Sequence, residues 1–154
     1  GMSSLLFKKF REKNGLTYDI GVINPVRIDN APFLIYLSLS PKHAQLAFKI
    51  LISIWKDICT GLIPKKELDL AKTKLKNAIL NSNQNTEDII LRKVQLIGYQ
   101  MDHNFDFKSI GEFEKINSEV INKITNKYFK KPYLSLRGDS KICSEIKKIW
   151  IENF

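Results

Sequence analysis

The feature that most constrains the fold is the run HAQLAFKILISIWKDICT, residues 43–60, which places apolar side chains on nearly every side of a helix. Ser40 followed by Pro41 predicts the start of this helix, with a capping oxygen and then proline at the first helical position. Gly61 predicts its end. A helix that is apolar all round needs cover on more than one side. We therefore expect residues 41–60 to lie between other layers of the fold.

Strand patterns lie on both sides of this helix along the chain. Residues 17–23 alternate, with Tyr18, Ile20 and Val22 on one face. Residues 33–40 alternate as well, and the polar segment NPVRIDNAP between the two runs predicts an antiparallel pair. A third strand is predicted at 133–138.

The remaining segments have helical patterns. The first begins at Ser3 or Ser4, uses Leu5, Phe7 and Phe10 as apolar positions, and ends at Asn14-Gly15. The next helix follows Pro64 and has an apolar stripe of Leu68, Ala71, Leu75, Ala78 and Ile79. Further helices are predicted at 85–102, 107–115, 118–129 and 140–151. The last of these is expected to face inward with Ile142, Ile146, Ile149 and Trp150. Because the helices gather in the middle, we expect an α+β fold: an antiparallel sheet of three to four strands with several helices packed on one face. The length suits a single domain over residues 1–154.

The net charge of +9 raises the question of nucleic-acid binding. Only four of the 25 basic residues are arginines, the residue type that grips phosphate through two parallel hydrogen bonds. The lysines are spread over several helices. A lysine-rich solvated surface is therefore favoured, and a basic nucleic-acid-binding domain is kept as the weaker alternative. No apolar run reaches the ~18 residues of a membrane helix, and no secretion signal is present, which favours the cytoplasm and no membrane partner.

Motifs for chemistry within the chain are missing. There is no glycine-rich phosphate loop and no nucleophile elbow. His43 and His103 have no second histidine at helical spacing, so the sequence predicts no metal site. Cys59 and Cys143 lie in helical patterns and are interpreted as buried or half-buried thiols, not as a disulfide framework.

One stretch of the sequence carries a recognisable motif. GMSSLLFKKFREKNGLTYDIG, at the start of the chain, resembles a signature stretch of the pitrilysin and insulinase zinc metallopeptidases, which include the mitochondrial processing peptidases. In that family a helix written roughly Gly-Met-Ser-Ser-x-Leu-Phe…Arg-Glu-Lys-x-Gly-Leu-x-Tyr turns into a strand. The likeness continues, in order, through PKHAQLAFKI, GLIPKKELDLAKTKLKNAIL and INSEVINKITNKYF to Gly138-Asp139, and so covers nearly the whole chain.

The resemblance also implies what lies elsewhere. The chain lacks the His-x-x-Glu-His zinc motif of the family's catalytic domain, so it resembles the later part of the non-catalytic partner domain. A complete domain of this kind would have a further strand and helix before residue 1, which makes this domain N-terminally incomplete. The resemblance implies no cofactor in this chain and zinc in a partner catalytic domain.

An arginine and a tyrosine are the site residues that the resemblance implies. In family members the partner domain contributes this pair to hold the substrate backbone near the scissile bond, and the matching positions here are Arg11 and Tyr18. A guanidinium and a phenol can both donate to carbonyl oxygens, including one that gains negative charge during hydrolysis. From the residues alone, Arg11 is an ordinary helix-end cation and Tyr18 is a core residue beside Ile20, so both interpretations stand.

We therefore expect a non-catalytic substrate-binding or structural domain of a pitrilysin-like zinc metallopeptidase. Its partners would be a catalytic domain or subunit and an extended peptide substrate, and the chain alone would have no peptidase activity. The alternative is a stand-alone protein-interaction domain without a peptidase role. A homodimer is also expected, through the sheet edge or helix face that the preceding segment would cover.

Overall fold

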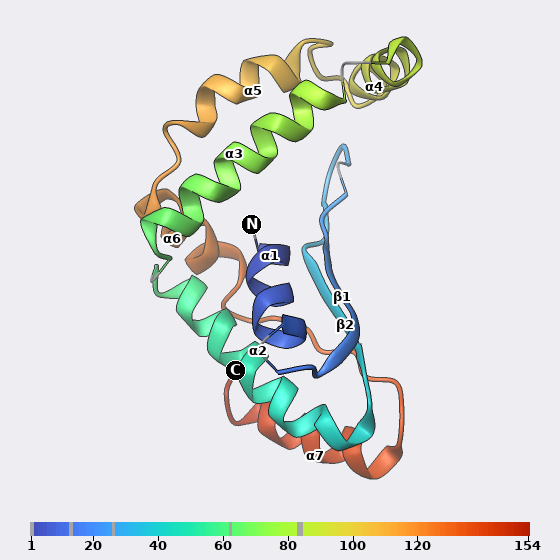
Figure 1. Cartoon of the computed structure of the whole chain (residues 1–154), viewed down its shortest axis with the longest axis vertical. Coiled ribbons are helices and arrows are strands. Elements are labelled where there is room, and N and C mark those ends of the chain that lie inside the picture. The colour runs from blue at the N-terminus through green and yellow to red at the C-terminus, as the bar shows by residue number, and fades with distance from the viewer. Residues whose placement is uncertain (1, 13, 26, 62, 83–84) are drawn as a thin grey trace. The chain divides into compact units, whose positions relative to one another are not determined.

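The computed structural model describes residues 2–12, 14–25, 27–61, 63–82 and 85–154. These divide into two compact units. We call Met2–Val22, Ile35–Ile63 and Ser118–Phe154 the core unit, and Ile23–Leu34 with Pro64–Asn117 the helical unit. The elements in chain order (Figure 1) are α1 Met2–Phe7, a π-helical turn Lys8–Glu12, β1 Thr17–Ile23, β2 Leu34–Leu39, a 3-10 turn Pro41–His43, α2 Ala44–Cys59, α3 Lys65–Asn81, α4 Thr86–Gly98, α5 Phe105–Phe113, α6 Ser118–Tyr128 and α7 Ser140–Ile151.

The sheet is a two-stranded ribbon of β1 and β2. The Thr17 hydroxyl donates to the Ser38 carbonyl, and a side chain at Gly21 would collide with the Tyr36 ring. Thr17 lies beside Ser38 and Gly21 lies beside Tyr36, so residue numbers rise along β1 and fall along β2. The two strands are therefore antiparallel. One face carries Ile20, Val22, Ile35, Leu37 and Leu39 against the core.

The predicted count of three to four strands is not confirmed. The described residues contain two strands, and 133–138 forms an extended segment outside the sheet. Leu134 packs on the core while Tyr133 is exposed, but Leu136, two residues after Leu134, is 39% exposed. Alternation predicts which side chains face inward, whereas a strand also requires a hydrogen-bonded neighbour, and this segment has none among the described residues.

The core surrounds α2, as its apolar pattern predicts. Seven residues of this helix are buried: Ala44, Ala47, Phe48, Leu51, Ile52, Ile54 and Ile58. The start differs from the prediction, because a 3-10 turn comes first and the Ser40 side chain makes no capping bond; its carbonyl accepts from the His43 N–H instead, at 2.9 Å. Ile54, the most enclosed of the large side chains on this helix, is 1% exposed.

α6 and α7 cover α2 within the core unit. The Asn122 and Asn126 amides of α6 donate to the carbonyl of Cys59 at 3.0 and 3.1 Å, which satisfies an acceptor at the end of α2. α7 begins at the Asp139 carboxylate, which accepts from the N–H of Lys141 and of Ile142, and it buries Ile146. Ile142, Ile149 and Trp150 pack against the same core, as predicted.

The helical unit has a different interior. No residue of α3 is buried, although its predicted apolar stripe is helical as expected. An Arg92–Asp106 pair joins α4 to α5 through two hydrogen bonds of 2.6 and 2.8 Å. Asn85 caps α4 through a bond from the Glu87 N–H at 3.0 Å. Within the described part of the chain, no helix combines the length and hydropathy needed to cross a bilayer.

Candidate functional site: the corner between α1 and β1

The corner between α1 and β1 is built from local backbone hydrogen bonds. After the π-helical turn, Gly15 takes a φ of +55°, a conformation that glycine adopts without strain. Its N–H donates to the Arg11 carbonyl at 3.1 Å, and the Leu16 N–H donates to the Phe10 carbonyl at 2.8 Å. α1 ends at Phe7 and the π-helical turn at Glu12, earlier than the predicted helix end, while the predicted glycine turn is present at Gly15.

Buried side chains anchor the corner on both sides. Phe10 before the turn is fully buried, and Leu16 after it is almost so. Thr17 is also buried, and its hydroxyl donates to the carbonyls of Asp19 and Ser38. These contacts tie the first residues of β1 to β2 and hold the corner in one geometry.

Arg11 lies in the π-helical turn with its side chain exposed. Its guanidinium carbon sits 5.1 Å from the centre of the Phe7 ring, a cation–π distance. Phe7 is 38% exposed and so serves as a platform for this cation, not as a core residue. The structure gives the Arg11 guanidinium no carboxylate partner among the described residues, which leaves its N–H donors open to a ligand.

Tyr18 is the second residue of β1, and its side chain is 85% exposed. It alternates with Ile20 and Val22, which do pack on the core. The interpretation of Tyr18 as a core residue is therefore wrong. No hydrogen bond to another described residue occupies its phenol group. The anchored corner thus carries two exposed donors, Arg11 and Tyr18, seven residues apart in sequence.

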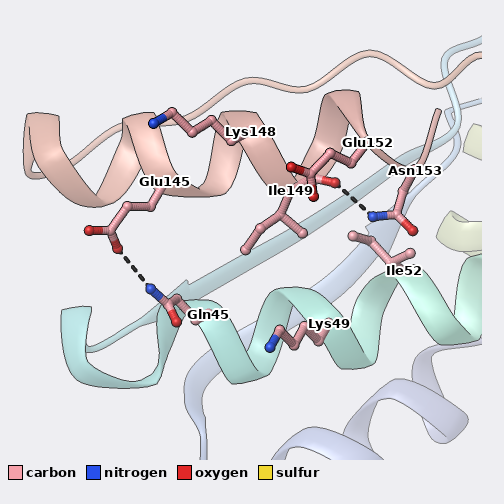
Figure 2. Close-up of a pocket in the computed structure, with 8 residues that line it drawn as sticks. All are labelled: Gln45, Lys49, Ile52, Glu145, Lys148, Ile149, Glu152 and Asn153. Carbon is pink, nitrogen blue, oxygen red and sulfur yellow. Dashed lines mark hydrogen bonds between the residues drawn. The ribbon is translucent and has the colours of Figure 1, made fainter.

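A separate hollow of about 510 Å³ lies between α2 and α7 (Figure 2). Ile52 and Ile149 extend into the space between the helices, and the Gln45 amide donates to the Glu145 carboxylate at 2.8 Å. Near the C-terminal end of α7, the Asn153 amide donates to the Ile149 carbonyl at 2.8 Å. Lys49, Lys148 and Glu152 complete the lining, to which neither Arg11 nor Tyr18 contributes.

The lining of this hollow has no hydroxyl, thiol or imidazole group, and its mixed charges suit a solvated seam between two helices. Sequence reasoning did not find it, because Gln45 and Glu145 are 100 residues apart and nothing local links them.

Metal ligands do not gather among the described residues: no group of three histidine, cysteine, aspartate or glutamate side chains could hold an ion there. His43 and His103 belong to different units of the chain. Cys59 and Cys143 are free, half-buried thiols, as predicted. Burial raises the pKa of the Cys59 thiol above its ordinary value, which favours its protonated form.

The corner lies within the part of the chain that matches a known protein family. Residues 1–75 match the family model of the peptidase M16 inactive domain, a match that contains both Arg11 and Tyr18. Residues 1–75 are thus similar in sequence to the peptidase M16 inactive domain. This is the pitrilysin-like family that the motif GMSSLLFKKFREKNGLTY indicates, and it confirms that resemblance.

Two further similarities extend this result. An uncharacterized zinc protease of Rickettsia felis is 36% identical over 85 residues, which are 54% of this chain and 20% of that protein. The crystal structure of a peptidase M16 inactive domain from Pseudomonas fluorescens superposes with a TM-score of 0.70 at 22% identity, over 82% of this chain and 30% of the solved one. The chain thus spans a minor part of each relative, and the solved structure shows the fold alone.

Proposed function

We propose that this M16 inactive domain binds extended peptide at the corner between α1 and β1, beside a zinc-bearing catalytic domain located elsewhere. In this function Arg11 and Tyr18 donate hydrogen bonds to backbone carbonyl oxygens of the substrate. The catalytic domain would supply the metal and the attacking water, and the inactive domain would complete the chamber. The proposed domain is a single one over residues 1–154.

The observation that carries the proposal is the exposure of Tyr18. A tyrosine next to packed neighbours on the same strand face would ordinarily bury its ring, yet 85% of this side chain is accessible. The exposed Arg11 is held on the same corner by Phe10 and Leu16. Two donors on a rigid frame avoid the ordering cost that a flexible loop would have on binding.

The test assays the assembly of this chain with its catalytic zinc domain on an extended peptide. We expect Arg11→Ala and Tyr18→Phe each to lower kcat/KM by roughly 10²-fold, the effect of losing one donor to a developing oxyanion. Matched controls are Arg27→Ala and Tyr128→Phe, which change the same residue types at exposed positions outside this corner. Unchanged turnover in both corner variants would contradict the substrate role.

Folding of the variants is checked separately by thermal unfolding. Because Tyr18 is exposed, Tyr18→Phe should leave the midpoint unchanged. A second check is metal analysis of the chain alone: we expect no stoichiometric zinc and no hydrolysis. One tightly held zinc per chain, with hydrolysis lost on chelation, would contradict the non-catalytic role.

A further inference from the structure

The extended segment 133–138 carries a row of backbone groups without partners. No backbone hydrogen bond joins these residues to any other described residue. At its start Leu134 packs on the core and Tyr133 is fully exposed, while Leu136 is 39% exposed. An extended chain with free N–H and C=O groups is a template on which another strand can pair.

A hollow of about 450 Å³ lies beside this segment, within the core unit. Its walls are mainly apolar, and it is lined by Pro132, Tyr133, Leu134, Leu136, Cys143, Ser144, Lys147, Trp150 and Ile151. In a paired strand every second side chain points to the same face. A strand added along 133–138 could therefore place alternate apolar side chains in this hollow.

The charges around the segment are almost all positive. Five cations lie on it or beside it: Lys130, Lys131, Arg137, Lys141 and Lys147. Asp139 is the single acid between residues 130 and 141, and its carboxylate is used to cap α7. None of the five cations forms an ion pair with a described carboxylate. This surface attracts an acidic partner.

We infer that residues 133–138 bind an extended segment of a partner polypeptide as an added β-strand, one that alternates acidic and apolar side chains. Backbone hydrogen bonds between the two strands supply the affinity. The hollow holds the apolar side chains of the partner, and the surrounding cations select its acidic side chains. The surface differs from the corner of Arg11 and Tyr18, and the inference does not depend on the proposed peptidase role.

The test uses the whole chain and a synthetic peptide of ~7 residues, the length of an ordinary strand, that alternates glutamate and valine. Amide hydrogen exchange is followed residue by residue with increasing peptide. We expect exchange at residues 133–138 to slow by roughly tenfold, the equivalent of one net backbone hydrogen bond, with α3 unaffected.

Two modified peptides separate strand pairing from simple attraction. Methylation of alternate backbone nitrogens removes the donors along one edge of the peptide, so one of the two methylation registers should abolish protection and the other should retain it. A peptide with lysine in place of glutamate should give no protection.

A matched pair of charge variants tests the position of the site. Lys130→Glu with Lys131→Glu should weaken binding of the acidic peptide at least tenfold, since it reverses two adjacent cations at the segment. Lys65→Glu with Lys66→Glu changes the net charge by the same amount on α3, in the helical unit, and should leave binding nearly unchanged.

Three results would overturn the inference. The first is no protection at saturating peptide, or equal protection by the lysine peptide. The second is protection that rises with protein concentration without peptide, which would make a second copy of the chain the occupant. The third is strong protection in the free protein at low concentration, which would mean that another segment already pairs with 133–138.

Discussion

α2 and α3 have 16 and 17 residues, yet α2 buries seven side chains and α3 buries none. In α2 the apolar residues occupy nearly all sides, so strands and helices can both cover them. In α3 the apolar residues form one stripe opposite lysines, and Leu75 within that stripe is 49% exposed. Helical periodicity alone therefore does not predict burial; a covering partner is also needed.

The same contrast holds for the two units as a whole. The core unit contains a continuous cluster of buried apolar residues from α1, α2 and α7. In the helical unit the described residues include one buried apolar side chain, Leu96, while polar bonds such as Arg92–Asp106 join its helices. A single partly buried ion pair of this kind contributes little stability compared with a packed apolar core. We expect the units to differ in stability accordingly.

The largest effect is expected from truncation inside the core. Leu51→Ala should lower the free energy of unfolding by about 2–5 kcal/mol, because it leaves a cavity beneath α2. Leu46→Ala makes the same change on the same helix at a position that is 52% exposed, and should cost less than about 0.5–1 kcal/mol. Urea unfolding followed by tryptophan fluorescence measures both. Equal losses would contradict the layered core.

The second expectation concerns the order of unfolding. Both tryptophans, Trp55 and Trp150, lie in the core unit, so their fluorescence reports that unit. Far-ultraviolet circular dichroism reports the helices of both units. We expect part of the helical signal to be lost at lower urea than the fluorescence change, because α3–α5 lack a comparable core. Coincident transitions would show that the two units unfold as one.

A smaller effect is expected where α6 closes the end of α2. Asn126→Ala removes a donor to the carbonyl of Cys59, and should cost about 1 kcal/mol. Lys123→Ala is the matched control, since it changes an exposed residue of the same helix. The difference between the two midpoints in urea measures the loss of the Asn126 amide, which also donates to the carbonyl and the side-chain oxygen of Asn122. If Lys123→Ala lowers the urea midpoint as much as Asn126→Ala does, a change in helix propensity explains both losses and the hydrogen bonds of Asn126 do not.

The smallest expected effect is a pH dependence in the helical unit. A hydrogen bond from Lys108 and then one from the backbone of Asn104 lower the pKa of Asp102. A carboxyl group whose folded pKa is depressed adds stability above its unfolded pKa, and this is lost as the pH falls through the folded value. Helical signal at fixed urea should therefore fall slightly below pH ~4 in the wild type.

The matching variant removes this titration. Asp102→Asn should flatten the acid-side dependence, and Lys108→Gln should reduce it by removing the main donor. If both variants lose helical signal below pH ~4 as much as the wild type does, other carboxyl groups cause the pH dependence.

Much of the local structure was predictable from the sequence. α7 occupies the predicted residues 140–151, and Gly15 forms the expected turn before β1, although α1 and its π-helical turn end earlier, at Glu12. These boundaries depend on capping residues and on glycine, whose effects extend over only a few positions. The family resemblance was also present in the order of motifs, and it is this resemblance that implies Arg11 and Tyr18 as site residues.

Long-range contacts decided the rest. Residues 133–138 have the alternation of a strand but no neighbouring strand among the described residues, and Tyr18 shares a face with Ile20 yet remains exposed. The hollow bridged by Gln45 and Glu145 joins residues that sequence proximity could not pair. The physical reason is that periodicity assigns a side chain to a face, whereas burial depends on which distant element covers that face.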